Sequence, residues 1–299
     1  MQQLFHTREE ACTRAFNDHR PFFIITTAAL PWLMFTDEDE FKAGTNGIAY
    51  SVVKSGICML MDVQMHNHMH FVVSGKAETA DLFCSILERQ TRKLMLSLGR
   101  NLPRPWDINI SEIDNLEYVR KAISYLCRNP YVAASDFTPL GYRWSGAYLL
   151  FNQHLDEINT GTPWLKALDR TKREICRSHD TDLPKQYFVR GGAITRESYI
   201  DYRLAEAMFN SARQFFLFLS RRGEADIEIA GLTGESILLP NDEVYSIVRS
   251  WFDVKSLQLL DINQRTEAAR RMKSSLRSNN KQISQILRLP MEAVERMFP

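Results

Sequence analysis

The chain has 299 residues, of which 44% are hydrophobic and 24% charged, which is the composition of an ordinary folded globular protein. Its 37 Lys and Arg nearly balance its 36 Asp and Glu, and the formal net charge is +1. The overall charge therefore excludes a globally basic nucleic-acid-binding chain, and any basic surface has to be local.

The N-terminal segment, the cysteines and the hydropathy of the chain argue against several further classes of protein. Five scattered cysteines form no Cys-x-x-Cys pair, which argues against a zinc knuckle or a disulfide framework. The first 16 residues lack the apolar core and cleavage site of a signal peptide. No run approaches the roughly 20 apolar residues of a membrane span. We therefore expect a cytoplasmic protein without a membrane partner.

The first half of the chain alternates strand and helix signals. β-Branched and aromatic runs predict strands, and apolar residues at helical spacing after acidic or Thr caps predict helices. In chain order these are a strand at 21–28, a helix from Thr36 to about Ser55, strands at 57–65 and 68–74, a helix at 79–98, a strand at 107–113, and a helix from Leu116 to about Cys127 that Pro130 stops.

This order predicts an α+β fold. The sequence β-α-β-β-α-β-α is that of a ferredoxin-like, split βαβ antiparallel sheet with helices on one face. We expect it to occupy residues 1–150 and to be followed by an all-α C-terminal region.

The second half is predicted to be helical, at 147–157, 164–178, 195–221 and 241–260. Three short helical segments follow, at 264–276, 280–287 and 290–298, with Ile283, Ile286 and Val294 pointing inward. They are consistent with a helix-turn-helix or with a small capping subdomain. We accordingly divide this half into a helical extension, 151–262, and a small basic segment, 263–299.

Charge is distributed unevenly between these regions. Residues 1–150 carry 15 basic and 16 acidic side chains, whereas residues 263–299 carry 8 basic and 3 acidic side chains. Any basic surface that binds nucleic acid is therefore expected mainly in the C-terminal segment.

A histidine cluster on the third predicted strand is the first candidate for chemistry. Because side chains alternate along a strand, His68 and His70 point to the same side and can share one metal ion. The alternative is a pair of histidines on a solvated strand face that holds no metal.

The helix after the fourth strand carries two further candidates. Tyr125 and Asn129 are four residues apart and share one helix face. An Asn oxygen can complete a metal site beside two imidazoles, and a phenol becomes a competent nucleophile when a cation polarises its electrophile. The alternative reading is a core tyrosine and an Asn-Pro helix stop.

Three motifs together resemble the HUH-type single-tyrosine transposases, the insertion-sequence-200-like family, and within it the branch associated with repeated extragenic palindromes. The family's Met-Pro-Asn-His-Val-His stretch is similar to 65–70, its Tyr-x-x-x-Asn-Pro helix end to 125–130, and its aromatic-Trp-Ser-Ser-Tyr stretch to 142–148. The resemblance covers residues 20 to about 150. His66 stands in place of the family's Pro, and we leave it out of the metal set.

The resemblance implies a function and a role for each residue. His68, His70 and Asn129 would bind Mg²⁺ or Mn²⁺, and Tyr125 would attack a phosphate of single-stranded or hairpin DNA. The attack would leave a 5′-phosphotyrosine link and a free 3′ hydroxyl, and a second 3′ hydroxyl would complete strand transfer, as in DNA transposition or a domesticated derivative. Relatives include monomers and homodimers with shared sites, so both remain open.

Basic residues near the candidate site and in the tail are predicted to contact DNA. They are Lys121, Arg128, Arg143, Arg270, Arg271 and Lys281. The alternative for each is an ordinary solvated cation.

Two other functions are compatible with the sequence. One is a non-catalytic DNA-binding regulator that retains the fold and binds through its basic C-terminal segment. The other is a metal-dependent nuclease that uses water in place of tyrosine.

Overall fold

The computed structural model describes residues 2–133, 138–155, 161–220, 241–276 and 278–298. The chain forms two compact units, residues 1–219 and 220–299. These boundaries differ from the predicted ones at 150 and 262, because residues up to 219 pack on the first unit. Within the described ranges, no helix is long and apolar enough to cross a membrane.

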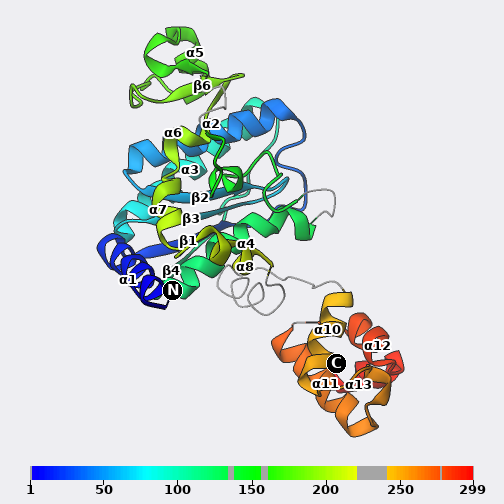
Figure 1. Cartoon of the computed structure of the whole chain (residues 1–299). Coiled ribbons are helices and arrows are strands. Elements are labelled where there is room, and N and C mark those ends of the chain that lie inside the picture. Colours follow the sequence, from blue (N-terminus) through cyan, green and yellow to red (C-terminus); the bar gives the residue numbers. More distant parts are fainter. Residues whose placement is uncertain (1, 134–137, 156–160, 221–240, 277, 299) are drawn as a thin grey trace. The chain divides into compact units, whose positions relative to one another are not determined.

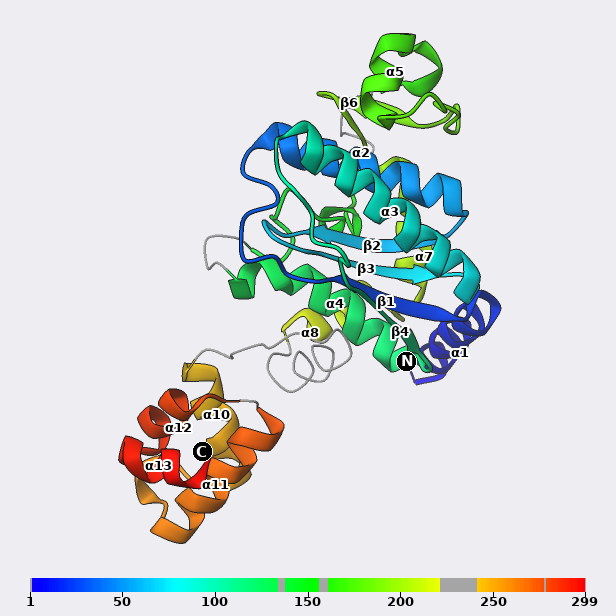
Figure 2. The ribbon, with the colours of Figure 1, turned by 180° about the vertical axis from the view of Figure 1, so that it is seen from behind.

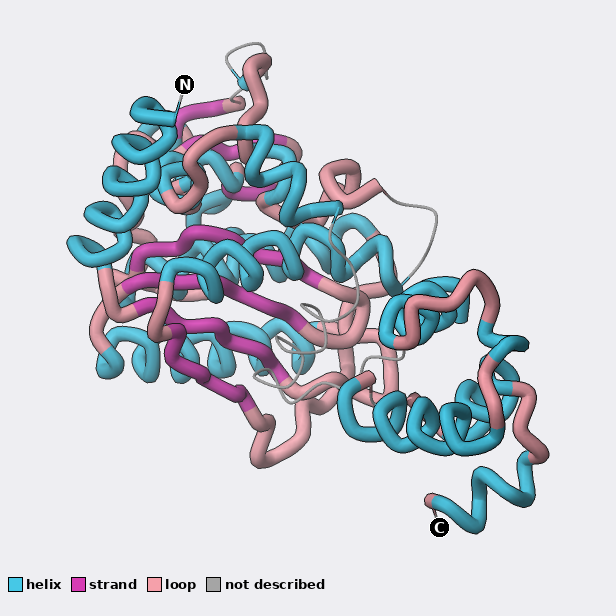
Figure 3. The backbone as a smooth tube through the Cα atoms, turned by 60° about the horizontal axis from the view of Figure 1, so that its bottom comes forward, coloured by secondary structure: helices cyan, strands magenta, loops and turns pink. Residues whose placement is uncertain are grey.

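The first unit is built on a four-stranded sheet. Its strands are β1 (Phe22–Thr27), β2 (Cys58–Gln64), β3 (Met69–Ser74) and β4 (Ile108–Ile113), in the spatial order β2-β3-β1-β4. Every neighbouring pair is antiparallel, and Figure 3 shows the four strands side by side. The predicted α+β class and all four predicted strands are confirmed.

Three long helices lie at the predicted places: two connect strands of the sheet, and the third follows its last strand. They are α2 (Glu38–Ser55), α3 (Ala77–Ser97) and α4 (Leu116–Ala133). The side chain of Asp37 accepts a hydrogen bond from the Glu40 amide at 2.9 Å and starts α2, and Gly56 ends it in the left-handed conformation. The prediction that Pro130 stops α4 is wrong: the helix continues to Ala133, and Pro130 is a buried residue inside it.

The helices cover both faces of the sheet, contrary to the prediction of one face. Phe71 of β3 packs edge-on against Phe83 of α3, whereas the next residue towards the N-terminus, His70, lies against Asn129 of α4. Adjacent residues of a strand point to opposite faces. Hence α2 and α3 lie on one side of the strands and α4 on the other (Figure 1, Figure 2).

An N-terminal helix and a second small sheet were not predicted. Helix α1 (Gln2–His19) packs on the first unit through Phe16, which stacks on Phe22 with centroids 5.3 Å apart. Residues 151–219 are not all helical, because β5 (Thr162–Pro163), β6 (Phe188–Arg190) and β7 (Ala193–Ile194) form a three-stranded sheet. The other elements among the described residues of this unit are η1 (Ala147–Leu149), η3 (Trp164–Lys166), α5 (Asp169–Cys176), α6 (Arg196–Tyr199), α7 (Tyr202–Ala207) and α8 (Ala212–Ser220).

Two later segments cover the outer edge of β2. The Gln64 amide donates to the Trp144 carbonyl at 2.9 Å, and the Asp201 amide donates to the Met59 carbonyl at 2.7 Å. These bonds satisfy backbone groups that an edge strand would otherwise expose. They also explain why the part of the chain beyond residue 150 belongs to the first unit.

The described residues of the second unit form helices and connecting loops. They are α10 (Asn241–Trp251), η4 (Leu257–Leu259), α11 (Ile262–Ser275), α12 (Asn280–Leu287) and α13 (Met291–Met297). The last three match the predicted short helices, and Ile283, Ile286 and Val294 are buried as predicted. A capping box between Asp261 and Gln264 starts α11.

Two buried glycines of α2 allow a test of how tightly this helix packs on the sheet. A methyl group at Gly44 would meet the Gln64 side chain and lie 2.7 Å from the Phe35 ring, whereas one at Gly47 meets only Gln90, at 3.4 Å. We predict that Gly44→Ala lowers the free energy of unfolding by about 1–3 kcal/mol through overpacking.

Gly47→Ala is the matched control in the same helix. We predict that it leaves stability unchanged or raises it by about 0.5–1 kcal/mol, because alanine favours a helix interior over glycine. Urea midpoints of the two variants measure the difference, and equal midpoints would show that Gly44 is not packed as described.

Candidate active site

His70 lies at the centre of the candidate site and is completely buried. Thr26 of β1 is its direct cross-strand neighbour, so both side chains point to the α4 face of the sheet. The Thr26 hydroxyl and the His70 Nδ1 atom are 2.9 Å apart and share a hydrogen bond. This bond fixes the ring and turns Nε2 towards α4.

Helix α4 brings two side chains to the Nε2 side of His70. The Asn129 side-chain nitrogen lies 3.2 Å from His70 Nε2. The Tyr125 ring, one turn earlier on the same face, meets the His70 ring edge-on with centroids 5.9 Å apart. Tyr125 is 2% exposed and Asn129 is half-buried. The predicted residues of the strand and of the helix therefore converge.

His68 completes the group from the residue just before β3. Its ring lies 4.7 Å from the His70 ring, centroid to centroid, at an interplanar angle of 89°. Its Nδ1 atom is 2.8 Å from the Asn67 side-chain oxygen, and the Asn67 side-chain nitrogen donates to the Leu30 carbonyl. The two histidines thus lie on the same side of the strand, and His68 is oriented by a neighbour that is itself held.

The donors present suit a divalent metal. Among the described residues there is no group of three or more His, Cys, Asp or Glu that could hold a metal ion. The candidate group instead consists of two imidazoles and one amide, and a half-turn of the Asn129 amide would direct its oxygen to the side of His70 Nε2. Imidazole nitrogens suit divalent transition-metal ions, and an amide oxygen suits harder ions such as Mn²⁺ and Mg²⁺, with water or phosphate oxygens completing the shell.

His66 lies apart from this group. Its Nδ1 atom is 2.8 Å from the Phe35 carbonyl, and its ring lies edge-on to Phe41 of α2. It therefore belongs to the α2 side of the β2–β3 connection, which supports its omission from the metal set.

The three basic residues predicted near the site differ in their surroundings. Arg128 is 2% exposed and donates to the Phe218 and Leu219 carbonyls at the end of α8, so burial argues against the predicted phosphate contact. Lys121 is paired with Glu117 at 3.7 Å. Arg143 is exposed but forms two hydrogen bonds, of 2.9 and 2.8 Å, with Glu38.

The predicted basic residues of the second unit are accessible. Arg270, Arg271 and Lys281 are all exposed, and the guanidinium of Arg271 lies 4.2 Å from the centre of the Trp251 ring.

A buried polar group on the opposite face of the sheet was not predicted from the sequence. Asp62 of β2 is paired with Phe71, so it points to the α2 and α3 face, away from His70. It accepts hydrogen bonds from Arg196 Nε at 3.0 Å and from the Tyr199 hydroxyl at 3.1 Å. The signal available was a single charged residue in a strand of mainly apolar residues, which implies a buried partner.

The electrostatics of this buried group follow from its isolation. Burial raises the pKa of Tyr199 well above its usual value, and the adjacent Asp62 adds to that rise. Burial by itself would lower the pKa of Arg196, but the Asp62 carboxylate more than compensates and raises it. Arg196 therefore stays protonated and forms a buried ion pair with Asp62.

No protein-family model, no curated protein and no solved structure matches this chain.

The Thr26–His70 hydrogen bond generates a prediction about metal affinity. Thr26→Val keeps the shape of a β-branched residue but removes the hydroxyl that orients His70. We predict that Mn²⁺ binding, followed by electron paramagnetic resonance of free Mn²⁺, weakens about 10- to 100-fold.

Thr91→Val, at a comparably buried threonine of α3, is the control and should bind Mn²⁺ like the unmodified protein. Unchanged affinity in Thr26→Val would contradict a role for Thr26 in positioning His70.

Proposed function

We propose that this protein cleaves and rejoins single-stranded DNA through a covalent link to Tyr125, with a divalent metal bound by His68, His70 and Asn129. One observation carries the proposal: a phenol, two imidazoles and an amide from separate elements meet on one side of the sheet, all oriented about the buried His70. Such a set suits phosphoryl transfer, in which a polarised phosphate meets a positioned nucleophile.

Each residue of the candidate site has a separate role in the proposed reaction. The Tyr125 oxygen attacks a DNA phosphate, forming a 5′-phosphotyrosine bond as the bond to the 3′ oxygen breaks; the phenolic proton is lost and the 3′ oxygen gains one. The bound Mg²⁺ or Mn²⁺ would polarise the phosphate. Because Tyr125 itself is buried, the half-buried His68 and Asn129 mark the side from which a strand approaches. A second 3′ hydroxyl then displaces Tyr125, and no nucleotide hydrolysis is needed.

The topology of the first unit supports the assignment. The element order β1-α2-β2-β3-α3-β4-α4 with the strand order β2-β3-β1-β4 is what a ferredoxin-like split βαβ unit has. We infer that the unit belongs to this fold and to the HUH transposase family that its motifs resemble. We propose that the site is built within one protomer, because α4 of the same chain brings Tyr125 and Asn129 to His70.

A second candidate function is a DNA-binding regulator without catalysis. The exposed Arg270, Arg271 and Lys281 on the helices of the second unit favour it. Cations on one small helical unit bind a phosphate backbone in a salt-dependent manner.

The tyrosine chemistry is tested by trapping the covalent intermediate. Purified protein is incubated with Mn²⁺ and labelled hairpin DNA from the flanks of its own gene, then separated on a denaturing gel. We predict a labelled protein band that Tyr125→Phe abolishes and that chelation of the metal prevents.

Tyr118→Phe, on the same helix α4, is the matched control and should retain the band. An undiminished band in Tyr125→Phe would overturn the assignment of the nucleophile. DNA cleavage without any band would point to a nuclease that uses water.

The regulator is tested through salt dependence. Replacing the three exposed basic residues of the second unit by glutamine should weaken hairpin binding. It should also reduce the slope of log affinity against log salt by about 0.7–0.9 for each DNA phosphate that is no longer neutralised. The variant combines Arg270→Gln, Arg271→Gln and Lys281→Gln.

The control removes the same charge from exposed sites of the first unit, with Arg170→Gln, Arg173→Gln and Lys185→Gln. Fluorescence anisotropy of labelled DNA measures both variants. Equal slopes for the two would show that the second unit makes no specific contribution to binding.

A further inference from the structure

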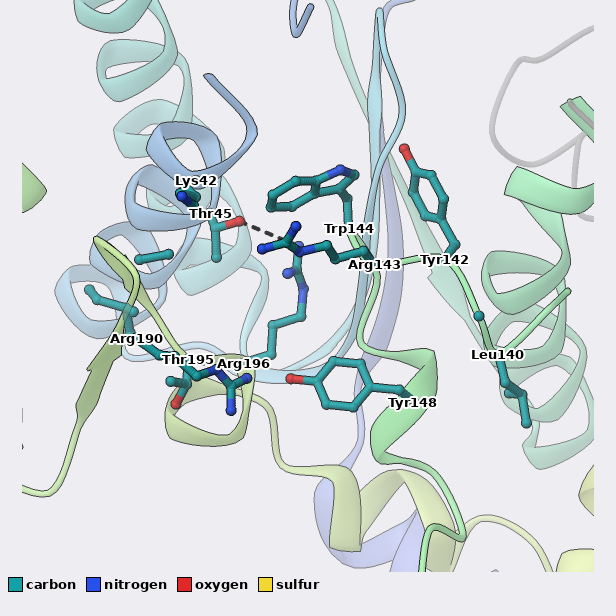
Figure 4. Close-up of a pocket in the computed structure, with 13 residues that line it drawn as sticks. Lys42, Thr45, Leu140, Tyr142, Arg143, Trp144, Tyr148, Arg190, Thr195 and Arg196 are labelled. Atoms are coloured by element: carbon teal, nitrogen blue, oxygen red, sulfur yellow. Dashed lines mark hydrogen bonds between the residues drawn. The ribbon is translucent and has the colours of Figure 1, made fainter. Parts of the chain in front are cut away.

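A cavity of about 270 Å³ lies in the first unit, away from the candidate active site. Two parts of the chain enclose it against α2: the 140–148 segment and the stretch from β6 to α6. Figure 4 shows the side chains of Trp144 and Tyr148 facing those of Thr45 and Arg196 across it. Because Arg196 bonds Asp62, this cavity belongs to the α2 and α3 face of the sheet.

Arg196 is a buried and rigidly held donor in this cavity. It is only 6% exposed, and its Nε atom bonds both oxygens of Asp62, at 3.0 and 3.2 Å. Nη2 makes a long contact of 3.5 Å with the Thr45 hydroxyl, and Nη1 donates to no described residue. Since Arg196 lines the cavity, the outer edge of its guanidinium is available to a ligand.

Trp144 provides a fixed flat wall. It is half-buried and stacks on Phe41 of α2, with centroids 4.7 Å apart and planes within 9° of parallel. This contact holds the orientation of the indole plane, and the exposed Arg143 guanidinium lies 5.0 Å from the centre of the ring. A flat aromatic wall beside a rigid donor pair suits a planar ligand that carries hydrogen-bond acceptors.

The charges around the cavity disfavour an isolated phosphate. Lys42 and Arg143 both pair with Glu38, and Arg190 lies 3.5 Å from Glu197. Arg196 is neutralised by Asp62. The cavity therefore offers donors with little uncompensated positive charge, and a neutral heterocycle fits it better than a bare anion.

We propose that this cavity binds one unpaired nucleobase and that it selects guanine. The O6 and N7 atoms of guanine match the two donors of an arginine edge, which is the commonest specific arginine–base pairing. A base that replaced the exposed Arg143 guanidinium over the Trp144 ring would gain stacking affinity, whichever base it is. That the base comes from the substrate strand rests on the proposed function; the recognition of a guanine does not.

The position of the cavity connects it to the candidate active site. The Trp144 carbonyl accepts from the Gln64 amide, and Gln64 pairs with Met69 next to His68. The cavity therefore lies at the end of the sheet that carries His68, on the other face. A single strand that passes this end can place one base here and a phosphate near Tyr125.

The test is a calorimetric titration of the full chain with separate small ligands. We expect dGMP to bind, dCMP and inorganic phosphate to bind at least about tenfold more weakly, and 7-deaza-dGMP, which lacks N7, to lose about tenfold. Changing the ligand requires no variant and so does not depend on folding. Equal affinity for dGMP and phosphate, or for dGMP and its 7-deaza analogue, overturns the proposal.

A protein variant tests the wall. Trp144→Leu should weaken dGMP binding about tenfold or more. Trp251→Leu is the matched control, since Trp251 is also half-buried beneath an arginine, and it should bind dGMP normally. Equal loss in both variants would contradict the assignment.

Two further experiments distinguish a base of the substrate strand from a free nucleotide, and failure of this site from failure of the proposed function. In a series of hairpin DNAs, 7-deazaguanine replaces the guanine at one unpaired position at a time. If the bound base belongs to the substrate strand, one member of the series should bind more weakly than the unmodified hairpin, and Trp144→Leu should remove that difference. If no member binds more weakly while dGMP still binds, the cavity holds a free nucleotide. Tyr125→Phe should leave dGMP binding unchanged. If the unmodified protein forms no covalent band but binds dGMP, only the proposed function is rejected. If it forms the band but does not bind dGMP, only this site is rejected.

Discussion

The burial of one imidazole is the constraint on which the candidate site depends. His70 is on a strand with neighbours on both sides and is covered by α4, so both of its ring nitrogens need polar partners within the protein. Thr26 supplies one and Asn129 the other. The contact between Asn129 and His70 fixes the rotation of α4 about its axis. Tyr125, one helical turn earlier, is therefore also directed to His70.

Local periodicity predicted this arrangement in part. Alternation along β3 predicted that His68 and His70 share a side, and four-residue spacing predicted the same for Tyr125 and Asn129, because both depend only on backbone geometry. It could not predict which face of the sheet α4 covers, since β1 is buried along its whole length and shows no polar side. Nor could it show that Pro130 is tolerated inside α4, where packing overrides the missing hydrogen bond.

Contacts between distant parts of the chain were beyond prediction from the sequence. Asp62 and Arg196 are separated by 134 positions, and the β6–β7 segment could be read only as a loop or helix because its strands are two or three residues long. Arg128 is a further case: its charge and its place near the candidate site predicted a phosphate contact, but its side chain is buried against α8. A basic residue beside a candidate site cannot be assigned to DNA until its own neighbours are known.

The Arg128 contact has a mechanical consequence. Its guanidinium is bonded to the last carbonyls of α8, where the chain leaves the first unit, and the next residue along α4 is Asn129. The last turn of α8 is thus anchored beside Asn129, which lies against His70. A displacement of the end of α8 would therefore be transmitted first to α4, the helix that carries both Tyr125 and Asn129.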